Sequence, residues 1–463
     1  MKKDEINNCV VRIIAENIEI NFKIPYQIKT PTKGQGTGFF IDNKGHILTC
    51  AHVIQSSKNI YIEIPSIDNK KHKCNVIGLC PEFDIALIKC LDYKSKTYLK
   101  LGDSNKLSSE DKVVVIGYPA SMTKSSSNKN NLKFTNGIIS GQQNGLIQTD
   151  SAINPGNSGG PLFCKNKVIG INSQKLVAPS LDNIGYAIPI NNYKVIKDQF
   201  NKNIIINRPN LLLNYDNTTE EIIKNLTNNK IKNGIIVSKL YEDSPLKNTE
   251  IKKDSIITKI NNIEIDNYGI SKNHKWINTN ISINDIISNC KNNQKIKIEY
   301  YNNDKKKVST VDLKPIDLKI KQVFSSFEEV PYFILGGMIF MNLTLNHILS
   351  NFQNPKMICL MMDEEFLFKE HVIISYIFPN TEIDILNNLE ENDIIKKVND
   401  IEVNNLKELI KALDKCILKN KKEYIRIENN KGKSILMLKS DLIKQNEIFS
   451  KTFDYNLSNF HEK

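Results

Sequence analysis

The apolar residues of the first 196 positions fall into short runs that are separated by Gly, Asn, Asp and Pro. Each run has the length of a strand, and long helical periods are rare in this part of the chain. Short strands at regular spacing are typical of an all-β barrel or sandwich. We therefore predict a β-rich first domain with strands in VVRII, EINFKI, GTGFFI, HILTCAHVI, NIYIEI, DIALIKC, KVVVIGY, GIIS, GLIQT, KVIGINS and IGYAIPI.

A domain boundary follows this β-rich part. The segment NNYKVIKDQF fits a short closing helix, and the polar stretch NKNIIINRPN around Pro209 fits a linker. With 463 residues the chain is too long for a single core, and the usual size of domains predicts about three units.

The second half of the chain contains a weak internal repeat. KDSIITKINNIEI at 253–265 aligns without gaps with ENDIIKKVNDIEV at 391–403. A strand-like segment precedes each copy. A helix-compatible segment follows each, SINDIISNC or NLKELIKAL, and then a strand, KIKIEYY or EYIRIEN. This order of elements resembles the PDZ module, an α+β fold.

The composition excludes two classes of protein. A hydrophobic fraction of 40% and a charged fraction of 25% are ordinary for soluble globular proteins, and no stretch reaches the length of a membrane span. The net charge of +12 comes from Lys residues scattered among Asn and Ile, which favours a composition bias over a nucleic-acid site. We predict neither a membrane span nor a nucleic-acid partner.

Cysteine usage indicates free thiols. The nine cysteines form no CxxC pair and have no His at metal-ligand spacing, so we predict no metal site and a reducing compartment. The start MKKDEINNC lacks the apolar region of a signal peptide. If the chain is complete, these features predict cytoplasm or nucleus, with an organelle not excluded.

Three separated segments predict the chemistry. In INPGNSGGP, Ser158 lies in a turn of small residues whose N–H groups can converge on a developing oxyanion. TCAHVI supplies His52, and EFDIALIKC brings Asp84 to the start of an apolar strand. Serine activation needs an imidazole base and a carboxylate that fixes its tautomer. The residues His52, Asp84 and Ser158 therefore predict a catalytic triad.

Three other polar residues are interpreted without catalytic roles. We expect His46 and His72 to be solvated hairpin or loop residues. Cys50, next to the base, is expected to be a small buried filler, because a serine already occupies the role of nucleophile.

TCAHVI, FDIALI and INPGNSGGP resemble the three active-site motifs of the Deg/HtrA serine proteases. The resemblance implies a mainly β protein: a chymotrypsin-like double β-barrel at 8–205, a PDZ-like domain at 206–325 and a divergent PDZ-like domain at 326–455. YFILGGMIFMNLTLNHIL at 332–349 is similar to the divergent second PDZ domain of the plant-type members. The resemblance to the Deg/HtrA proteases further implies that the substrates are unfolded or damaged proteins, that the protein forms a homo-oligomer (a trimer or a multiple of one) and that it needs no cofactor.

The resemblance also assigns roles around the triad, and it implies that Asp150 is a structural carboxylate. Gly156, Asn157 and Ser158 would form the oxyanion hole. The walls of the specificity pocket would come from Ala152, Ile153, Asn172, Ser173, Gln174 and Ile188, with Tyr186 and Ala187 beside them. Neither wall carries a carboxylate, so we expect cleavage after small or medium aliphatic residues rather than after Lys or Arg.

The chain departs from the family pattern at several places. Only GQQNG separates GIIS from LIQTD, where a longer sensor loop is usual, and ASMTKSSSNKNNLKF is expanded. The Gly that often precedes the Asp of the PDZ signature is replaced by Lys253 and Asn392. Peptide binding by the PDZ-like domains therefore stays open. The alternative function is a proteolytically weak peptide-binding or holdase protein.

Overall fold

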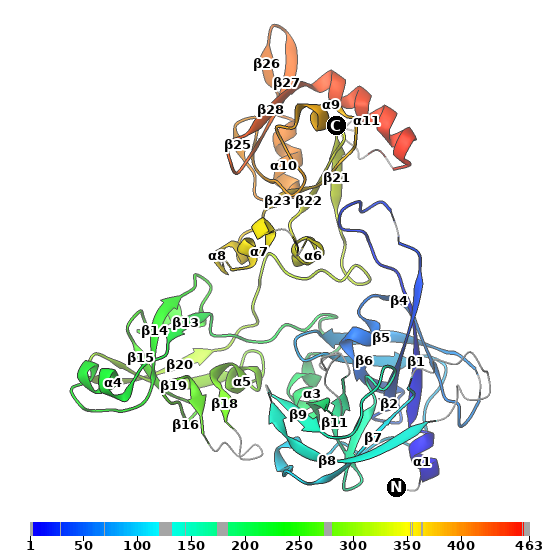
Figure 1. The fold of residues 1–463 in the computed structure, drawn as a ribbon, viewed down its shortest axis with the longest axis vertical. Helices are drawn as coiled ribbons and strands as arrows, with labels where there is room; N and C mark the ends of the chain where they lie inside the picture. The colour runs from blue at the N-terminus through cyan, green and yellow to red at the C-terminus, as the bar shows by residue number, and fades with distance from the viewer. Residues whose placement is uncertain are drawn as a thin grey trace. The chain divides into compact units, whose positions relative to one another are not determined.

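The computed structural model describes residues 3–27, 29–68, 70–119, 132–143, 145–173, 184–272, 280–351, 353, 355–362, 364–455 and 457 (Figure 1). Contacts divide the chain into two compact units. The first consists of Met1–Asn17 and Thr32–Ile316, and the second of Ile18–Pro31 and Asp317–Lys463. Among the described residues, no helix is long and apolar enough to cross a membrane.

Two closed six-stranded barrels, drawn in blue to cyan-green in Figure 1, form the larger part of the first unit. The first barrel has the order β1-β2-β3-β6-β5-β4, and the second β10-β11-β12-β9-β8-β7. The first contains β1 Val10–Asn17, β2 Thr32–Phe40, β3 His46–Cys50, β4 Ser57–Glu63, β5 His72–Cys80 and β6 Ile85–Cys90. The second contains β7 Lys112–Gly117, β8 Lys133–Gln143, β9 Leu146–Thr149, β10 Pro161–Cys164, β11 Lys167–Asn172 and β12 Gly185–Pro189. This pair of barrels confirms the predicted fold class.

The helices in the described part of the barrel region are short. They are α1 Lys3–Asn7, α2 Ala51–Ile54, η1 Ser104–Lys106, α3 Ile190–Ile196 and η4 Lys197–Gln199. The helix α2 begins directly where β3 ends, and α3 begins directly after β12, at the position of the predicted closing helix. Because these strands continue directly into short helices, the side chains at the junctions are held in fixed positions.

The segment EINFKI at 19–24 does not form the barrel strand that its alternating pattern predicts. It lies between β1 and β2 and belongs to the second unit, where Phe22, Ile24 and Tyr26 pack against a buried apolar cluster. Alternation indicates that one face of a segment is buried, but it does not identify the core that buries it. The strand prediction is wrong for this reason.

The first PDZ-like sheet lies in the first unit and has the order β13-β14-β15-β19-β20, with β16 paired to β15. Its strands are β13 Leu213–Asp216, β14 Ile235–Leu240, β15 Ile256–Ile260, β16 Ile263–Glu264, β19 Lys295–Asn302 and β20 Lys305–Asp312. The pair β17 Ile270–Ser271 and β18 Ile281–Ser282 and the helices α4 Glu220–Leu226, η5 Pro245–Asn248 and α5 Ile283–Ser288 complete the described part.

The second unit contains the corresponding sheet, in the order β21-β22-β23-β24-β27-β26, with β25 on β24 and β28 on β27. Its strands are β21 Tyr332–Leu335, β22 Met338–Asn342, β23 Val372–Ile377, β24 Ile394–Val398, β25 Ile401–Glu402, β26 Ile417–Lys419, β27 Lys422–Asn429 and β28 Ser434–Leu438. Its helices are α6 Leu345–Ser350, α7 Pro355–Met362, α8 Glu364–Leu367, α9 Glu382–Leu386, α10 Leu406–Leu413 and α11 Lys439–Phe453.

The internal repeat forms the same hairpin in both sheets. Asn261 and Asn262 join β15 to β16 with φ of 50° and 66°, and Asn399 and Asp400 join β24 to β25 with φ of 51° and 66°. Two successive residues with positive φ are the mark of a type I′ turn, which matches the twist of a hairpin.

The structure changes which residue of the first copy stands in place of the glycine of the PDZ signature. Asp254 and Asn392 both have a φ of 70°. The next side chains, Ser255 and Asp393, accept hydrogen bonds from the N–H groups three residues earlier, at 2.9 and 3.0 Å. The left-handed position of the first copy is therefore Asp254, one residue after the predicted Lys253. Asp and Asn tolerate this conformation better than other residues with side chains.

Candidate active site between the two barrels

Asp84 lies immediately before β6, and its carboxylate is held by three hydrogen bonds. Oδ1 accepts from the His52 N–H at 2.9 Å. Oδ2 accepts from the Ser173 hydroxyl at 3.0 Å and lies 2.7 Å from His52 Nδ1. The residue has a φ of 55° and is almost fully buried. These three bonds fix the orientation of the carboxylate towards His52.

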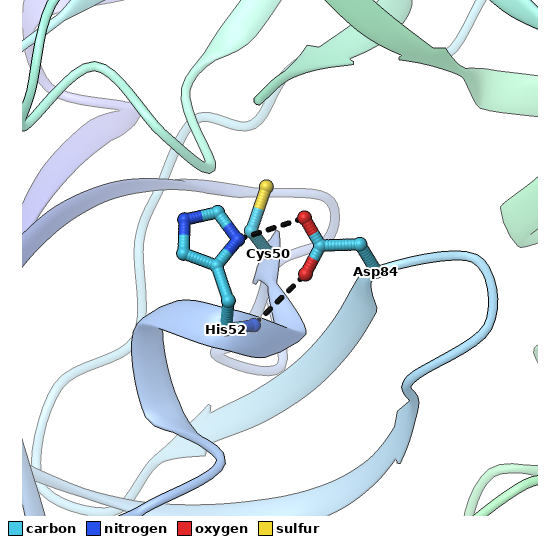
Figure 2. A group of neighbouring side chains, drawn as sticks. All are labelled: Cys50, His52 and Asp84. Carbon is cyan, nitrogen blue, oxygen red and sulfur yellow. Dashed lines mark hydrogen bonds and ion pairs between the residues drawn. The ribbon is translucent and has the colours of Figure 1, made fainter. Parts of the chain in front are cut away.

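His52 lies on α2, and its ring faces Asp84 (Figure 2). Because Nδ1 is directed at an acceptor-only carboxylate, the proton of the neutral ring is held on Nδ1. The other ring nitrogen is then the basic one. The side chain is 20% exposed, so it is open to a ligand from one side.

The loop before Ser158 contains a tight turn at Pro155 and Gly156. The N–H of Asn157 donates to the carbonyl of Asn154 at 3.0 Å, and Gly156 has a φ of 95°. Proline followed by a residue with positive φ is the pattern of a type II turn, which fixes the orientation of the peptide group between them. Gly159 also has a positive φ, 86°, and its N–H donates to Asn172 in the second barrel.

Strand β2 of the first barrel braces this loop of the second barrel. The Thr37 N–H donates to the Ser158 carbonyl at 2.8 Å, and the Thr37 hydroxyl donates to the Gly156 carbonyl at 2.7 Å. The Thr37 hydroxyl also accepts from the Tyr118 N–H at 2.9 Å. The site therefore lies where the two barrels meet. No local sequence pattern marks Thr37 for this bracing role, so sequence reasoning missed it.

Cys50 is buried, as predicted, and its thiol donates to the carbonyl of Asn172 at 3.2 Å. Burial and the nearby Asp84 carboxylate raise the pKa of this thiol well above its ordinary value. A thiol held in its protonated form is a poor nucleophile.

The residues predicted to wall the pocket have different environments. Ala152 is exposed, and Ile188 lines a cavity of about 720 Å³ that also reaches Asp84. Ile153 packs in an apolar cluster. The Asn172 amide donates internally to the carbonyl of Pro161 at 3.1 Å. Gln174 lies outside the described residues.

Ser173 takes a different place from the one that the pocket interpretation implies. Its side chain is fully buried, and its hydroxyl donates to the Asp84 carboxylate. Ser173 therefore contacts the Asp84 carboxylate of the Asp84–His52 pair. Sequence reasoning selected this residue for its neighbourhood and missed the contact, because Ser173 and Asp84 are distant in the chain.

Two further sequence interpretations concern histidines. His46 begins β3 and lies 2.6 Å from Asp42. His72 was expected to be solvated but is buried inside the first barrel, with 8% of its surface exposed. That expectation is wrong, because His72 shares the inward face of β5 with Cys74.

Asp150 accepts a hydrogen bond from the Ile138 N–H at 2.7 Å, which fits a structural role. The segment GQQNG, expected to be a short loop, extends the hairpin, because β8 continues to Gln143 before β9 begins at Leu146. Most of the expanded segment at 120–134 lies outside the described residues.

Comparisons with known proteins agree with this architecture. Residues 36–171 match the family described as trypsin-like peptidase domain, and residues 323–453 match the PDZ domain. A probable periplasmic serine endoprotease, DegP-like, from Rickettsia prowazekii is 34% identical over 53% of this chain and 49% of its own length. A putative mitochondrial protease Do-like 3 from Arabidopsis thaliana is 28% identical over 93% of this chain and 75% of its own length.

The chain therefore carries a trypsin-like peptidase domain and a PDZ domain, and it is similar over most of its length to Do-like proteases. It spans about half the length of the Rickettsia relative, at 49%. Among solved structures, the HtrA-type protease AlgW with decapeptide has a TM-score of 0.51 and 22% identity over 68% of this chain and 97% of its own. That likeness shows the fold of a Deg/HtrA protein and nothing further.

The predicted compartment is contradicted. The Deg/HtrA relatives are named as periplasmic in Rickettsia and mitochondrial in Arabidopsis, neither of which is cytoplasm or nucleus. The prediction relied on cysteine usage and on the first residues of the given sequence, and the names of the relatives overturn it.

Proposed function

We propose that this protein is a serine endopeptidase that cleaves unfolded or damaged proteins through an acyl-enzyme. The observation that carries the proposal is the 2.7 Å contact between His52 Nδ1 and Asp84. It leaves the other ring nitrogen as the base. The braced turn that carries Ser158 supplies the second support.

In the proposed reaction, Ser158 Oγ attacks the carbonyl carbon of a peptide bond while His52 takes the hydroxyl proton. Asp84 stabilises the imidazolium that forms. The N–H groups of Gly156 and Ser158 stabilise the oxyanion, and His52 gives its proton to the amine as the peptide bond breaks. Water then attacks the acyl-enzyme, again with His52 as the base, and releases the acid and Ser158.

The proposed specificity is for small or medium aliphatic residues before the cut. Its support is the apolar character of Ile153 and Ile188 and the position of Asp150, whose carboxylate is engaged by the backbone of Ile138. Mass-spectrometric mapping of cuts in a denatured protein tests it. A majority of cuts after Lys or Arg would rule it out.

The test of the reaction compares Ser158→Ala with the wild type on casein. We expect Ser158→Ala to abolish cleavage while the barrels stay folded. Ser440→Ala, on the exposed face of α11, is the matched control and should keep full activity. Diisopropyl fluorophosphate should label Ser158 in the wild type. A folded protein that is not labelled and does not cleave supports the alternative peptide-binding or holdase function.

Three further properties are proposals of their own. We propose a homo-oligomer, a trimer or a multiple of one, which light scattering on the purified chain measures. We also propose that the protein has no nucleic-acid partner, so it should show no salt-dependent binding to DNA or RNA. Whether either PDZ-like domain binds peptides is tested by titration with peptides that carry free C-terminal carboxylates.

A further inference from the structure

The strand pair β5–β6 brings four potential metal ligands together at one end of the first barrel. Cys74 on β5 is the register partner of Cys90 on β6. Two residues further in the same register, His72 faces Asp92, and the Leu91 N–H donates to Lys73 at 3.0 Å, so the strands stay paired there. Side chains two residues apart lie on the same face of a strand. His72, Cys74, Cys90 and Asp92, here called the β5–β6 ligand group, therefore share one face.

The side chains of the group approach one another closely. One ligand atom from each of His72, Cys90 and Asp92 lies within 4.8 Å of the other two. His72 Nδ1 is 3.3 Å from Asp92 Oδ2, and Cys90 Sγ is 3.5 Å from Asp92 Oδ1. The Cys74 thiol donates to the His72 carbonyl at 3.8 Å. The interaction between the two neighbouring thiols raises the pKa of Cys74 and lowers that of Cys90.

The histidine of the group has unmet bonding capacity. The side chain of His72 is 90% buried, and neither ring nitrogen makes a hydrogen bond to the described residues. Its contacts with Asp92 at 3.3 Å and Asp68 at 3.5 Å are ion-pair distances without hydrogen-bond geometry. Buried polar groups without hydrogen bonds are rare in native proteins, and a missing ion is one explanation.

We propose that the β5–β6 ligand group binds a structural Zn²⁺ through Cys74, Cys90, His72 Nδ1 and Asp92. Thiolate and imidazole ligands select zinc over magnesium or calcium, and four protein ligands close a tetrahedral shell. Binding replaces the two thiol protons, which pass to solvent. Asp68 faces the other ring nitrogen, as the outer carboxylate of a metal-bound histidine does. The exposed Asp92 side chain, at 58%, leaves the ion a route from solvent.

Such a site would act on the barrel that carries Asp84. β6 begins one residue after Asp84 and ends at Cys90, so the ion would fix the end of the strand opposite to the proposed catalytic carboxylate. The ion would supply no reacting group. Its expected effect is on the stability of the first barrel.

The test loads the full-length chain, reduced and metal-free, with Zn²⁺ or Co²⁺. We expect one metal ion per chain by native mass spectrometry, a raised melting temperature, and a Co²⁺ spectrum with tetrahedral d–d bands and a thiolate charge-transfer band. Cys90→Ser should lose the ion and the charge-transfer band. Cys359→Ser, which removes an exposed thiol, should keep both.

Two variants with milder packing effects keep the test decisive if Cys90→Ser does not fold. Asp92→Ala should lower the Zn²⁺ affinity at least tenfold, because it removes a ligand. Asp68→Asn should lower it by roughly 10–100-fold, since it weakens the support of the His72 ring.

Three results would overturn the proposal. The first is no binding of Zn²⁺ by the reduced protein. The second is metal that stays bound in Cys90→Ser, because Cys50, His52 and Asp84 form the other cluster of suitable ligands among the described residues. The third is a chain lighter by two hydrogens with Cys74 linked to Cys90 and no affinity for metal after reduction. That result would make the pair a disulfide instead.

Discussion

Asp84 has a left-handed backbone conformation that its hydrogen bonds hold in place. Its N–H donates to the Pro81 carbonyl at 3.1 Å, and its own carbonyl accepts from Ala51 at 3.0 Å. With φ at 55° and the carboxylate bonded to His52 and Ser173, this residue has little freedom to reorient. Preorganisation of this kind lets a carboxylate stabilise an imidazolium without rearrangement.

Replacing Asp84 by Asn tests that role. The amide can present an N–H to His52 Nδ1, which favours the wrong tautomer, so we expect kcat to fall by about 10⁴-fold with the fold intact. Asp150→Asn is the matched control, since its amide oxygen can still accept from Ile138. Steady-state rates on a peptide ester measure both variants. A loss below tenfold for Asp84→Asn would show that Asp84 does not assist His52.

Gly156 is the second residue whose backbone matters. At a φ of 95° an alanine is strained, and relief of the strain rotates the peptide group whose N–H is proposed to bind the oxyanion. We expect Gly156→Ala to lower kcat by about 10²–10³-fold. Gly141→Ala is the control, because a Cβ there meets nothing within 4 Å. Equal activity of the two variants would exclude the proposed oxyanion hole.

His347 in the second unit predicts a pH dependence of stability. Its Nδ1 accepts from the Thr344 N–H at 3.1 Å, and burial lowers the pKa to about 4 from an ordinary value of 6.5. The unfolded state then binds the proton more tightly than the folded state. The stabilisation is complete above pH 6.5 and is lost as pH falls towards 4, by up to about 3 kcal/mol.

Urea unfolding followed by hydrogen exchange in the second unit measures this loss between pH 7 and pH 4. His347→Asn keeps an acceptor beside Thr344 but cannot titrate. Between pH 7 and pH 4 its free energy of unfolding should therefore fall by about 3 kcal/mol less than that of the wild type. A variant profile that parallels the wild type would assign the pH dependence to other groups.

At the scale of elements, the sequence predicts most strands of the two barrels but only a few of the helices. Ten of the eleven apolar segments predicted as strands in the first 196 residues contain a barrel strand, whereas β5 and β10 are not predicted. The repeat indicates matching elements in the two copies, and both copies form a hairpin, at Asn261 and at Asn399. Two features depend on the folded chain. The segment 19–24 is buried by another unit, and His72, Cys74, Cys90 and Asp92 are brought together by strand pairing between residues far apart in sequence. Spacing along a chain detects neither.

The three residues of the proposed triad show what local patterns can predict. His52, Asp84 and Ser158 are each marked by a local motif, so they could be predicted one by one. The bracing by Thr37 and the bond from Ser173 depend on the meeting of two barrels, and only the folded chain brings those atoms together.

Arg208 joins the linker to α5 and to the turn before Asp84. Its guanidinium donates to the carbonyls of Ser288 and Cys290, and it lies over the Phe83 ring at 4.8 Å. The side chain is fully buried, and burial lowers its pKa. Removing it leaves two buried carbonyls without these donors.

We therefore expect Arg208→Met to lower the free energy of unfolding of the first unit by about 2–4 kcal/mol. Because Phe83 precedes Asp84, hydrolysis of a small ester should fall as well. Arg426→Met, on the partly exposed strand β27, is the matched control and should change neither quantity measurably. Calorimetry on the full chain measures the stability. An unchanged melting temperature for Arg208→Met would show that the buried guanidinium contributes nothing.

At the scale of the whole molecule, one connection of the first barrel contributes to the core of the second unit. Phe22 meets the His347 ring edge-on, with centroids 5.4 Å apart, and Tyr26 lies 5.5 Å from Tyr455. Burial raises the pKa of Tyr26 to about 12, in keeping with its place among apolar side chains. The second unit as the sequence delimits it, from residue 326 onwards, therefore lacks part of its own core.

The double variant Phe22→Ala/Tyr26→Ala tests this dependence. Two aromatic side chains are removed from a partly buried site, so we expect the second unit to lose about 2–4 kcal/mol of unfolding free energy. Hydrogen exchange should become faster in β22 and β23, while β1 and β2, whose ladder does not use these side chains, should keep their protection. Tyr268→Ala, at 61% exposed, is the control and should leave both regions unchanged. Equal loss of protection in barrel and second unit would mean that residues 18–31 stabilise the barrel instead.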